Sequence, residues 1–133
     1  MLSTYFRLCH PKMTPTFTPG RNIALKVPPH AYEATIRFYR DVLRLQPIEN
    51  HPPNVGFEFG GKQLWVDRVA SLSQAEVWLE ILTDEVSAAA AYLEAAGVVR
   101  CDAIEPLPEG HQGFWIADPA SIVLHLGARS GEW

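Results

Sequence analysis

The 133-residue sequence lacks the features that mark several easily assigned protein classes. It has only two cysteines, Cys9 and Cys101, and neither stands in a spacing typical of a metal-binding motif. No apolar run approaches the length needed to cross a bilayer, which excludes a membrane-spanning helix. The sequence has 11 Lys and Arg against 15 Asp and Glu, and its formal charge is −4. The basic residues form no continuous run, so we expect no nucleic-acid partner.

Several catalytic motifs are absent as well. There is no Gly-rich phosphate loop, no Gly-x-Ser-x-Gly elbow and no Cys-x-x-Cys pair, which leaves no basis for nucleotide hydrolysis, serine-hydrolase chemistry or thioredoxin-like redox. Two cysteines without a secretory leader favour reduced thiols and a cytoplasmic location.

The composition is that of an ordinary globular protein, with 47% hydrophobic and 20% charged residues. A chain of this length can bury a core without disulfides or a structural metal. Residues 1–20 show no hydrophobic period and are rich in Pro and Thr in their second half, so we expect a flexible N-terminal arm. Met13 is an alternative start to Met1. The folded domain is expected at 21–133.

Two similar halves follow the arm, at about 21–69 and 75–128. Each begins with a segment of alternating polar and apolar residues, NIALKV at 22–27 and EVWLEI at 76–81, which is typical of a strand with one covered face. Each continues with a helix and then with short strands. The expected helices lie at 31–43 and 87–96; the later strands lie at 46–50, 55–59 and 62–69 in the first half, and at 100–104, 113–117 and 122–127 in the second.

Alternation divides each first strand into two faces. We expect the apolar side chains, those of Ile23, Leu25 and Val27 with their counterparts Val77, Leu79 and Ile81, to pack on the helices. The opposite face is free to line a shared cavity. It carries Asn22, Ala24, Lys26, Glu76, Trp78 and Glu80, joined from the last strand by Val123, His125 and Gly127.

The segments NIALKV, FYRDVLRLQPIE, EVWLEI, AAYLEAAGV and GFWIADPASIVLHL together resemble the vicinal oxygen chelate superfamily. That group includes glyoxalase I, extradiol dioxygenases, fosfomycin-modifying enzymes and bleomycin-resistance proteins. The resemblance implies an α+β fold of paired βαβββ modules whose curved mixed sheet encloses a cleft, and it implies a homodimer. Whether the two modules pair within one chain or are exchanged between two is left open.

In metal-dependent members, the resemblance implies ligands at the start of each module's first strand and in each module's last strand. These positions correspond here to Asn22, Glu76 and His125, with a fourth near Gln63 or Trp65. Asn22 is a poor ligand for a borderline divalent ion. We therefore expect no cofactor and a hydrogen-bonded pair of Glu76 and His125, with a divalent metal on these two residues as the alternative. Such a pair could also transfer protons, because the carboxylate would raise the pKa of the histidine.

Other side chains are candidates for ligand contacts. Trp65, Trp78 and Trp115 suit an aromatic wall, with core packing as the alternative for each. Glu80 is a candidate contact that could instead form a salt bridge with Lys26. His111 lies in a Gly-flanked loop, PEGHQG, of the kind that covers a cleft.

Two functions fit these residues. The first is a metal-independent protein of the bleomycin-resistance type that binds a small molecule in the cleft, where an acidic lining favours a cationic or amine-bearing ligand. The second is a divalent-metal lyase or dioxygenase related to the glyoxalases, with Glu76 and His125 as ligands. A purely structural module is a third class, which an occluded cleft would indicate.

Overall fold

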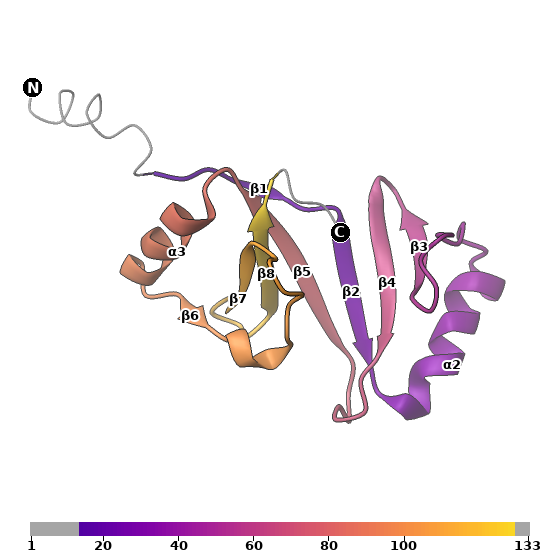
Figure 1. Ribbon diagram of the computed structural model, residues 1–133. Helices are drawn as coiled ribbons and strands as arrows, with labels where there is room; N and C mark the ends of the chain where they lie inside the picture. Colours follow the sequence, from indigo (N-terminus) through magenta and orange to yellow (C-terminus); the bar gives the residue numbers. More distant parts are fainter. Residues whose placement is uncertain (1–13, 130–133) are drawn as a thin grey trace, which may run out of the picture.

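The computed structural model describes residues 14–129, which form one mixed sheet of eight strands flanked by two helices (Figure 1). The strand order is β3-β4-β2-β5-β8-β7-β6, and β1 pairs with β5. In chain order the elements are β1 Phe17–Pro19, β2 Asn22–Val27, α2 Pro29–Arg37, the π-helical turn η1 Phe38–Val42, β3 Val55–Phe59, β4 Lys62–Arg68, β5 Glu76–Thr83, α3 Val86–Ala95, β6 Val99–Arg100, the 3-10 turn η2 Asp102–Ile104, β7 Gly113–Ala117 and β8 Val123–Ala128. The predicted α+β class is confirmed.

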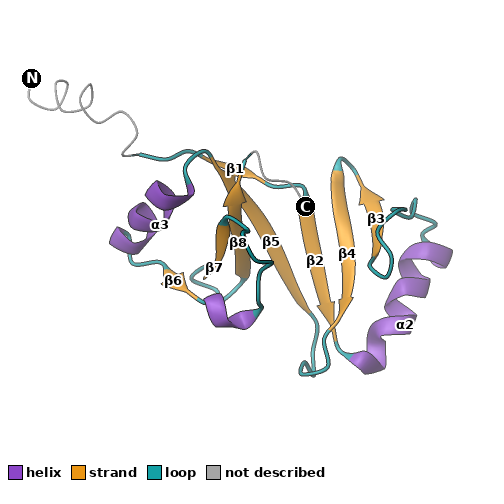
Figure 2. Ribbon diagram, viewed as in Figure 1, coloured by secondary structure: helices purple, strands orange, loops and turns teal. Residues whose placement is uncertain are grey.

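The first half packs α2 on the β3–β4 side of the sheet (Figure 2). Ile36 of α2 meets Val27, Phe57 and Val66 in a buried cluster. The helix predicted at 31–43 begins earlier, because a proline occupies its first turn where no N–H is needed, and its last part is the π-helical η1.

The second half repeats this arrangement with α3 against β8. Ala89 of α3 is buried with Phe114, Ile116 and Leu126. Gly97 follows the helix with φ 81°, a left-handed conformation that glycine adopts without strain. The strand predicted at 100–104 is shorter than expected, since β6 stops at Arg100 and η2 follows.

The two halves join through their first strands. β2 and β5 run antiparallel, with Ala24 opposite Trp78 and Lys26 opposite Glu76. In this structure the modules pair within one chain; exchange of modules between two chains stays an open alternative.

Two expectations about the surface need correction. Val77 and Leu79 were expected under a helix, yet they are 42% and 38% exposed, because β5 crosses the centre of the sheet between the helices and only Ile81 reaches the cluster around α3. Of the arm expected at 1–20, residues 1–13 lie outside the described residues, but Phe17–Pro19 form a strand on β5.

No helix within residues 14–129 is both long and apolar enough to cross a membrane.

Candidate functional site

An open cleft of about 350 Å³ lies on the sheet face opposite the helix-covered clusters. Ala24 and Trp78, which alternate with core residues along their strands, form its floor together with Trp115, and Val123 packs with the two tryptophans. The polar residues of the wall are Asn22, Lys26, His51, Asn54, Asp67, Glu105 and His125. The face predicted to be free therefore does line a cavity.

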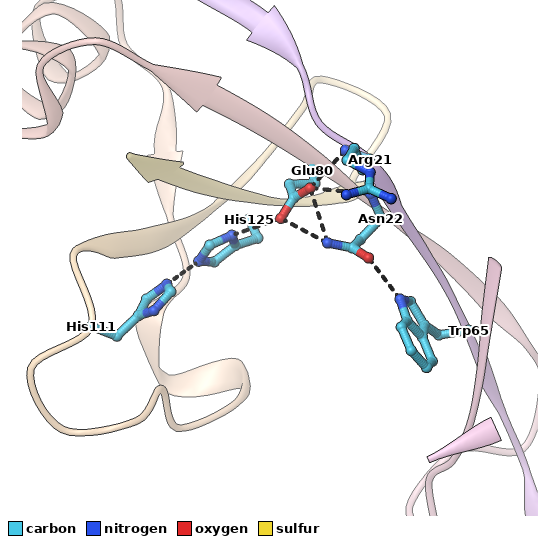
Figure 3. A network of polar contacts seen from close by, with 6 residues as sticks. All are labelled: Arg21, Asn22, Trp65, Glu80, His111 and His125. Carbon is cyan, nitrogen blue, oxygen red and sulfur yellow. Dashed lines mark hydrogen bonds and ion pairs between the residues drawn. The ribbon is translucent and has the colours of Figure 1, made fainter. Parts of the chain in front are cut away.

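A hydrogen-bond network joins the two halves beside this cleft (Figure 3). The Asn22 amide donates from Nδ2 to both Glu80 carboxylate oxygens, at 3.2 and 3.3 Å. Glu80 Oε1 also accepts the backbone N–H groups of Arg21 and Asn22, at 2.9 and 3.1 Å. The Trp65 indole Nε1 donates to Asn22 Oδ1 at 2.7 Å. Asn22, Trp65 and Glu80, predicted as separate ligand contacts, thus form one chain.

His125 lies in a narrow slot next to the network. Gly113 and Gly127 face each other across β7 and β8, and a Cβ on either would stand 2.9 Å from the imidazole. The Trp115 ring packs edge-on, with ring centroids 5.0 Å apart. His111 Nε2 lies 2.9 Å from His125 Nε2, within hydrogen-bond distance. These neighbours leave His125 only 4% exposed.

Burial keeps the His125 imidazole neutral. Loss of hydration, followed by the nearby His111, lowers the pKa of His125 from 6.5 to about 4, and the Glu80 carboxylate opposes this shift only in part. Glu80 Oε2 lies 3.9 Å from His125 Nδ1. We predicted that a carboxylate partner would raise this pKa; the prediction is wrong because the cost of burying the charged form dominates.

The carboxylate beside His125 is Glu80 and not Glu76, so the predicted Glu76–His125 pair is wrong. Glu80 lies opposite His125 in the β5–β8 ladder. Glu76 is exposed, lies opposite Lys26, and accepts a hydrogen bond from the Trp78 indole at 2.9 Å. Because β2 and β5 are antiparallel, equivalent positions in the two repeats fall at opposite ends of the pair.

Lys26 also has partners other than the predicted one. Its Nζ lies 2.9 Å from Asp67 and 3.0 Å from Glu105, and 4.3 Å from the centre of the Trp78 ring. Although burial alone would lower it, the hydrogen bonds and charges of the two carboxylates raise the pKa of Lys26 above its usual value. Lys26 is therefore a buried cation at one end of the cleft, and no salt bridge to Glu80 is needed.

Sequence reasoning missed four residues of this wall: His51, Asn54, Asp67 and Glu105. A signal for Asp67 was present in the sequence, because it follows Trp65 by two residues and so shares its face of the strand; the structure places it opposite Lys26. The other three lie in loops, where alternation gives no information about direction.

The residues that the resemblance places at metal-ligand positions do not meet at one point, because Glu76 lies opposite Lys26 whereas His125 lies opposite Glu80. Glu80 Oε1 already accepts three N–H groups and Asn22 Oδ1 accepts the Trp65 indole N–H, so both oxygens serve in the hydrogen-bond network. His125 faces His111 through Nε2, and no three His, Cys, Asp or Glu side chains in residues 14–129 converge on a point where an ion could bind. The expectation that the protein works without a cofactor stays a prediction.

The sequence matches no protein-family model and no curated protein. Solved structures do resemble it. The Mn(II)-bound glyoxalase from Novosphingobium aromaticivorans is 20% identical with a TM-score of 0.59, over 90% of this chain and 44% of that one. A glyoxalase/bleomycin resistance protein/dioxygenase superfamily member from Vibrio splendidus 12B01 is 10% identical with a TM-score of 0.53, over 82% and 97%.

A variant of homoprotocatechuate 2,3-dioxygenase from B. fuscum is 20% identical with a TM-score of 0.54, over 86% of this chain and 33% of that one. The chain thus spans less than half of this dioxygenase and of the Mn(II)-bound glyoxalase. Likeness at such identity speaks for the fold alone. The chain has a glyoxalase-like α+β fold, as the resemblance in its sequence implied.

Proposed function

We propose that the protein binds a small molecule with a flat aromatic part and a positive charge, and that it needs no catalytic metal to do so. The observation that carries the proposal is the cleft of about 350 Å³, whose wall combines three tryptophans with an excess of carboxylates over cations. Its size and its mixture of aromatic surface with a few polar groups are typical of small-molecule sites.

Trp65 is the tryptophan best placed to stack on a ligand. It is half-buried, whereas Trp78 and Trp115 are 7% and 5% exposed. The face of Trp78 is taken by the Lys26 ammonium, and the indole N–H of Trp115 donates to the Glu105 carbonyl oxygen. We therefore assign the aromatic part of the ligand to Trp65.

Asp67 and Glu105 supply the negative charge. Lys26 neutralises one of them, which leaves one net negative charge in this ion group. Their side chains remain 34% and 41% exposed, so they can also accept a hydrogen bond from a ligand. A second recess of about 320 Å³ shares these three residues and Asn54 with the cleft, and could receive a polar substituent.

His125 suits a cationic ligand because it carries no charge at neutral pH. Its pKa of about 4 leaves a neutral imidazole with one donor and one acceptor nitrogen. A protonated imidazole at this point of the wall would repel a positive ligand.

The planar cation 9-aminoacridine tests this proposal, with anthracene-9-carboxylate as the planar anion. We expect saturable one-to-one quenching of tryptophan fluorescence by the cation and much weaker binding of the anion. Glu105→Gln should weaken binding of the cation about threefold to tenfold. Glu94→Gln, which removes an exposed charge on α3, should leave it unchanged.

Two outcomes would contradict the proposal. One is equal binding of the two probes, which would assign no role to the carboxylates. The other is an undiminished affinity for 9-aminoacridine in Trp65→Ala, which would place the aromatic contact elsewhere.

The homodimer and the cytoplasmic location remain proposals that rest on the sequence. Sedimentation of the purified protein tests the first, and the second requires localisation of the protein in its host cell.

A further inference from the structure

Glu80 lies at the gap between the β2–β5 pairing and the β1–β5 pairing. The β2–β5 pairing includes Ala24, Leu25 and Lys26. Beyond it, the backbone N–H groups of Arg21 and Asn22 donate to the Glu80 carboxylate instead of to a strand. The side chain passes so close to Gly20 that a Cβ there would collide with it. Glu80 thus replaces the missing ladder bonds with an acceptor of fixed position.

An acceptor at this point decides which way the Asn22 amide faces. A carboxylate only accepts hydrogen bonds, so the NH₂ group of the amide turns toward Glu80 and its oxygen turns away. The oxygen then meets the indole N–H of Trp65 at 2.7 Å. With the amide reversed, oxygen would face carboxylate and NH₂ would face the indole N–H, so both contacts would be repulsive.

The Trp65 ring is held at two other points. Gly56 lies beneath it, where a Cβ would stand 2.5 Å from the ring. His51 packs edge-on, with ring centroids 5.6 Å apart. The bond from Nε1 to Asn22 adds a directional contact, which favours the ring orientation in which the indole N–H faces Asn22.

We propose that Glu80 and Asn22 are positioning residues that fix the orientation of Trp65, so that the wall of the cleft is ordered before any ligand arrives. Pre-ordering a contact reduces the entropy lost on binding. The family resemblance places a metal ligand at Asn22. In this structure the Asn22 side chain accepts the hydrogen bond of the Trp65 indole instead. The consequence for ligand affinity rests on the proposed function, whereas the positioning itself does not.

Solvent exchange of the Trp65 indole N–H, measured by NMR on ¹⁵N-labelled protein, tests the positioning without a ligand. Trp65→Phe identifies the signal. In Glu80→Gln the new amide can donate to Asn22, which lets the Asn22 amide reverse and lose the indole bond. We expect about fivefold faster exchange, the equivalent of one neutral hydrogen bond. Glu76→Gln, the same change on the exposed part of the same strand, should leave the Trp65 signal unchanged.

A double variant provides the rescue. Asn22→Asp alone places two carboxylates together and should also speed the exchange. Combined with Glu80→Gln, the new carboxylate accepts both the indole N–H and the new amide NH₂, so slow exchange should return. If the two residues had only a structural role, exchange in the double variant would be faster than in either single variant.

Each outcome of these exchange experiments either supports or overturns the positioning role of Glu80 and Asn22. Unchanged exchange in Glu80→Gln, or a folded double variant with fast exchange, would overturn the inference. If a single variant does not fold, recovery of both fold and slow exchange in the double variant supports it. Failure of wild type to bind 9-aminoacridine would count against the proposed function and leave the exchange result standing.

Discussion

The lowered pKa of His125 predicts a specific loss of stability in mild acid. Its pKa falls from 6.5 to about 4 in the folded protein because of burial and the nearby His111, with Glu80 opposing in part. The unfolded chain therefore takes up a proton near pH 6.5, while the folded protein does not. Stability from this group is full above pH 6.5 and declines as the pH falls toward 4.

A pKa lowered from 6.5 to about 4 corresponds to about 3 kcal/mol when the decline is complete, and to about 2 kcal/mol between pH 7.5 and pH 5. Urea unfolding at these two pH values measures the free energy of unfolding. His125→Gln removes the titrating group, so wild type should lose about 2 kcal/mol more than this variant over the interval. His30→Gln, at an exposed position, should behave like wild type.

An equal loss of stability in wild type and in His125→Gln would refute this reasoning. So would an NMR titration in which the His125 ring protonates near pH 6.5, because burial would then have no effect on the pKa.

Three further changes have defined outcomes. Gly113→Ala places a Cβ 2.6 Å from the Leu126 carbonyl oxygen and 2.9 Å from the His125 ring, and should lower the free energy of unfolding by about 1–3 kcal/mol. Urea titration measures this, and an unchanged midpoint would contradict the tight packing around His125. Lys26→Met leaves Asp67 and Glu105 without their buried cation, so it should lower the stability of the protein and tighten its binding of 9-aminoacridine. Thermal unfolding and fluorescence titration check the two effects, and weaker binding would indicate that Lys26 itself contacts the ligand. Elemental analysis after dialysis against Mn(II) should find well below one ion per chain, and one equivalent that disappears in His125→Ala would contradict the fit of the donor set described above.

Alternation along the strands predicted which face of the sheet carries the site. Asn22, Trp78 and His125 belong to three different strands, yet their parity placed all three on one side, where the cleft lies. The period of two is set by the backbone itself, so it survives whatever the strands pair with.

Position along the strands could not be predicted in the same way. The repeat made Glu76 the counterpart of Asn22, but antiparallel pairing put Glu80 beside Asn22 instead. Alternation gives the same parity to Glu76 and Glu80, which differ by about 13 Å along the strand. Register depends on contacts between distant segments, and so does the burial that reversed the expected pKa shift of His125.

A crystal structure of the complex with 9-aminoacridine tests the central claim most directly. The account predicts the ring stacked on Trp65 within the cleft, with its positive charge near Asp67 and Glu105. A ring seated on the exposed surface of Val77, with the cleft free of it, would contradict the account.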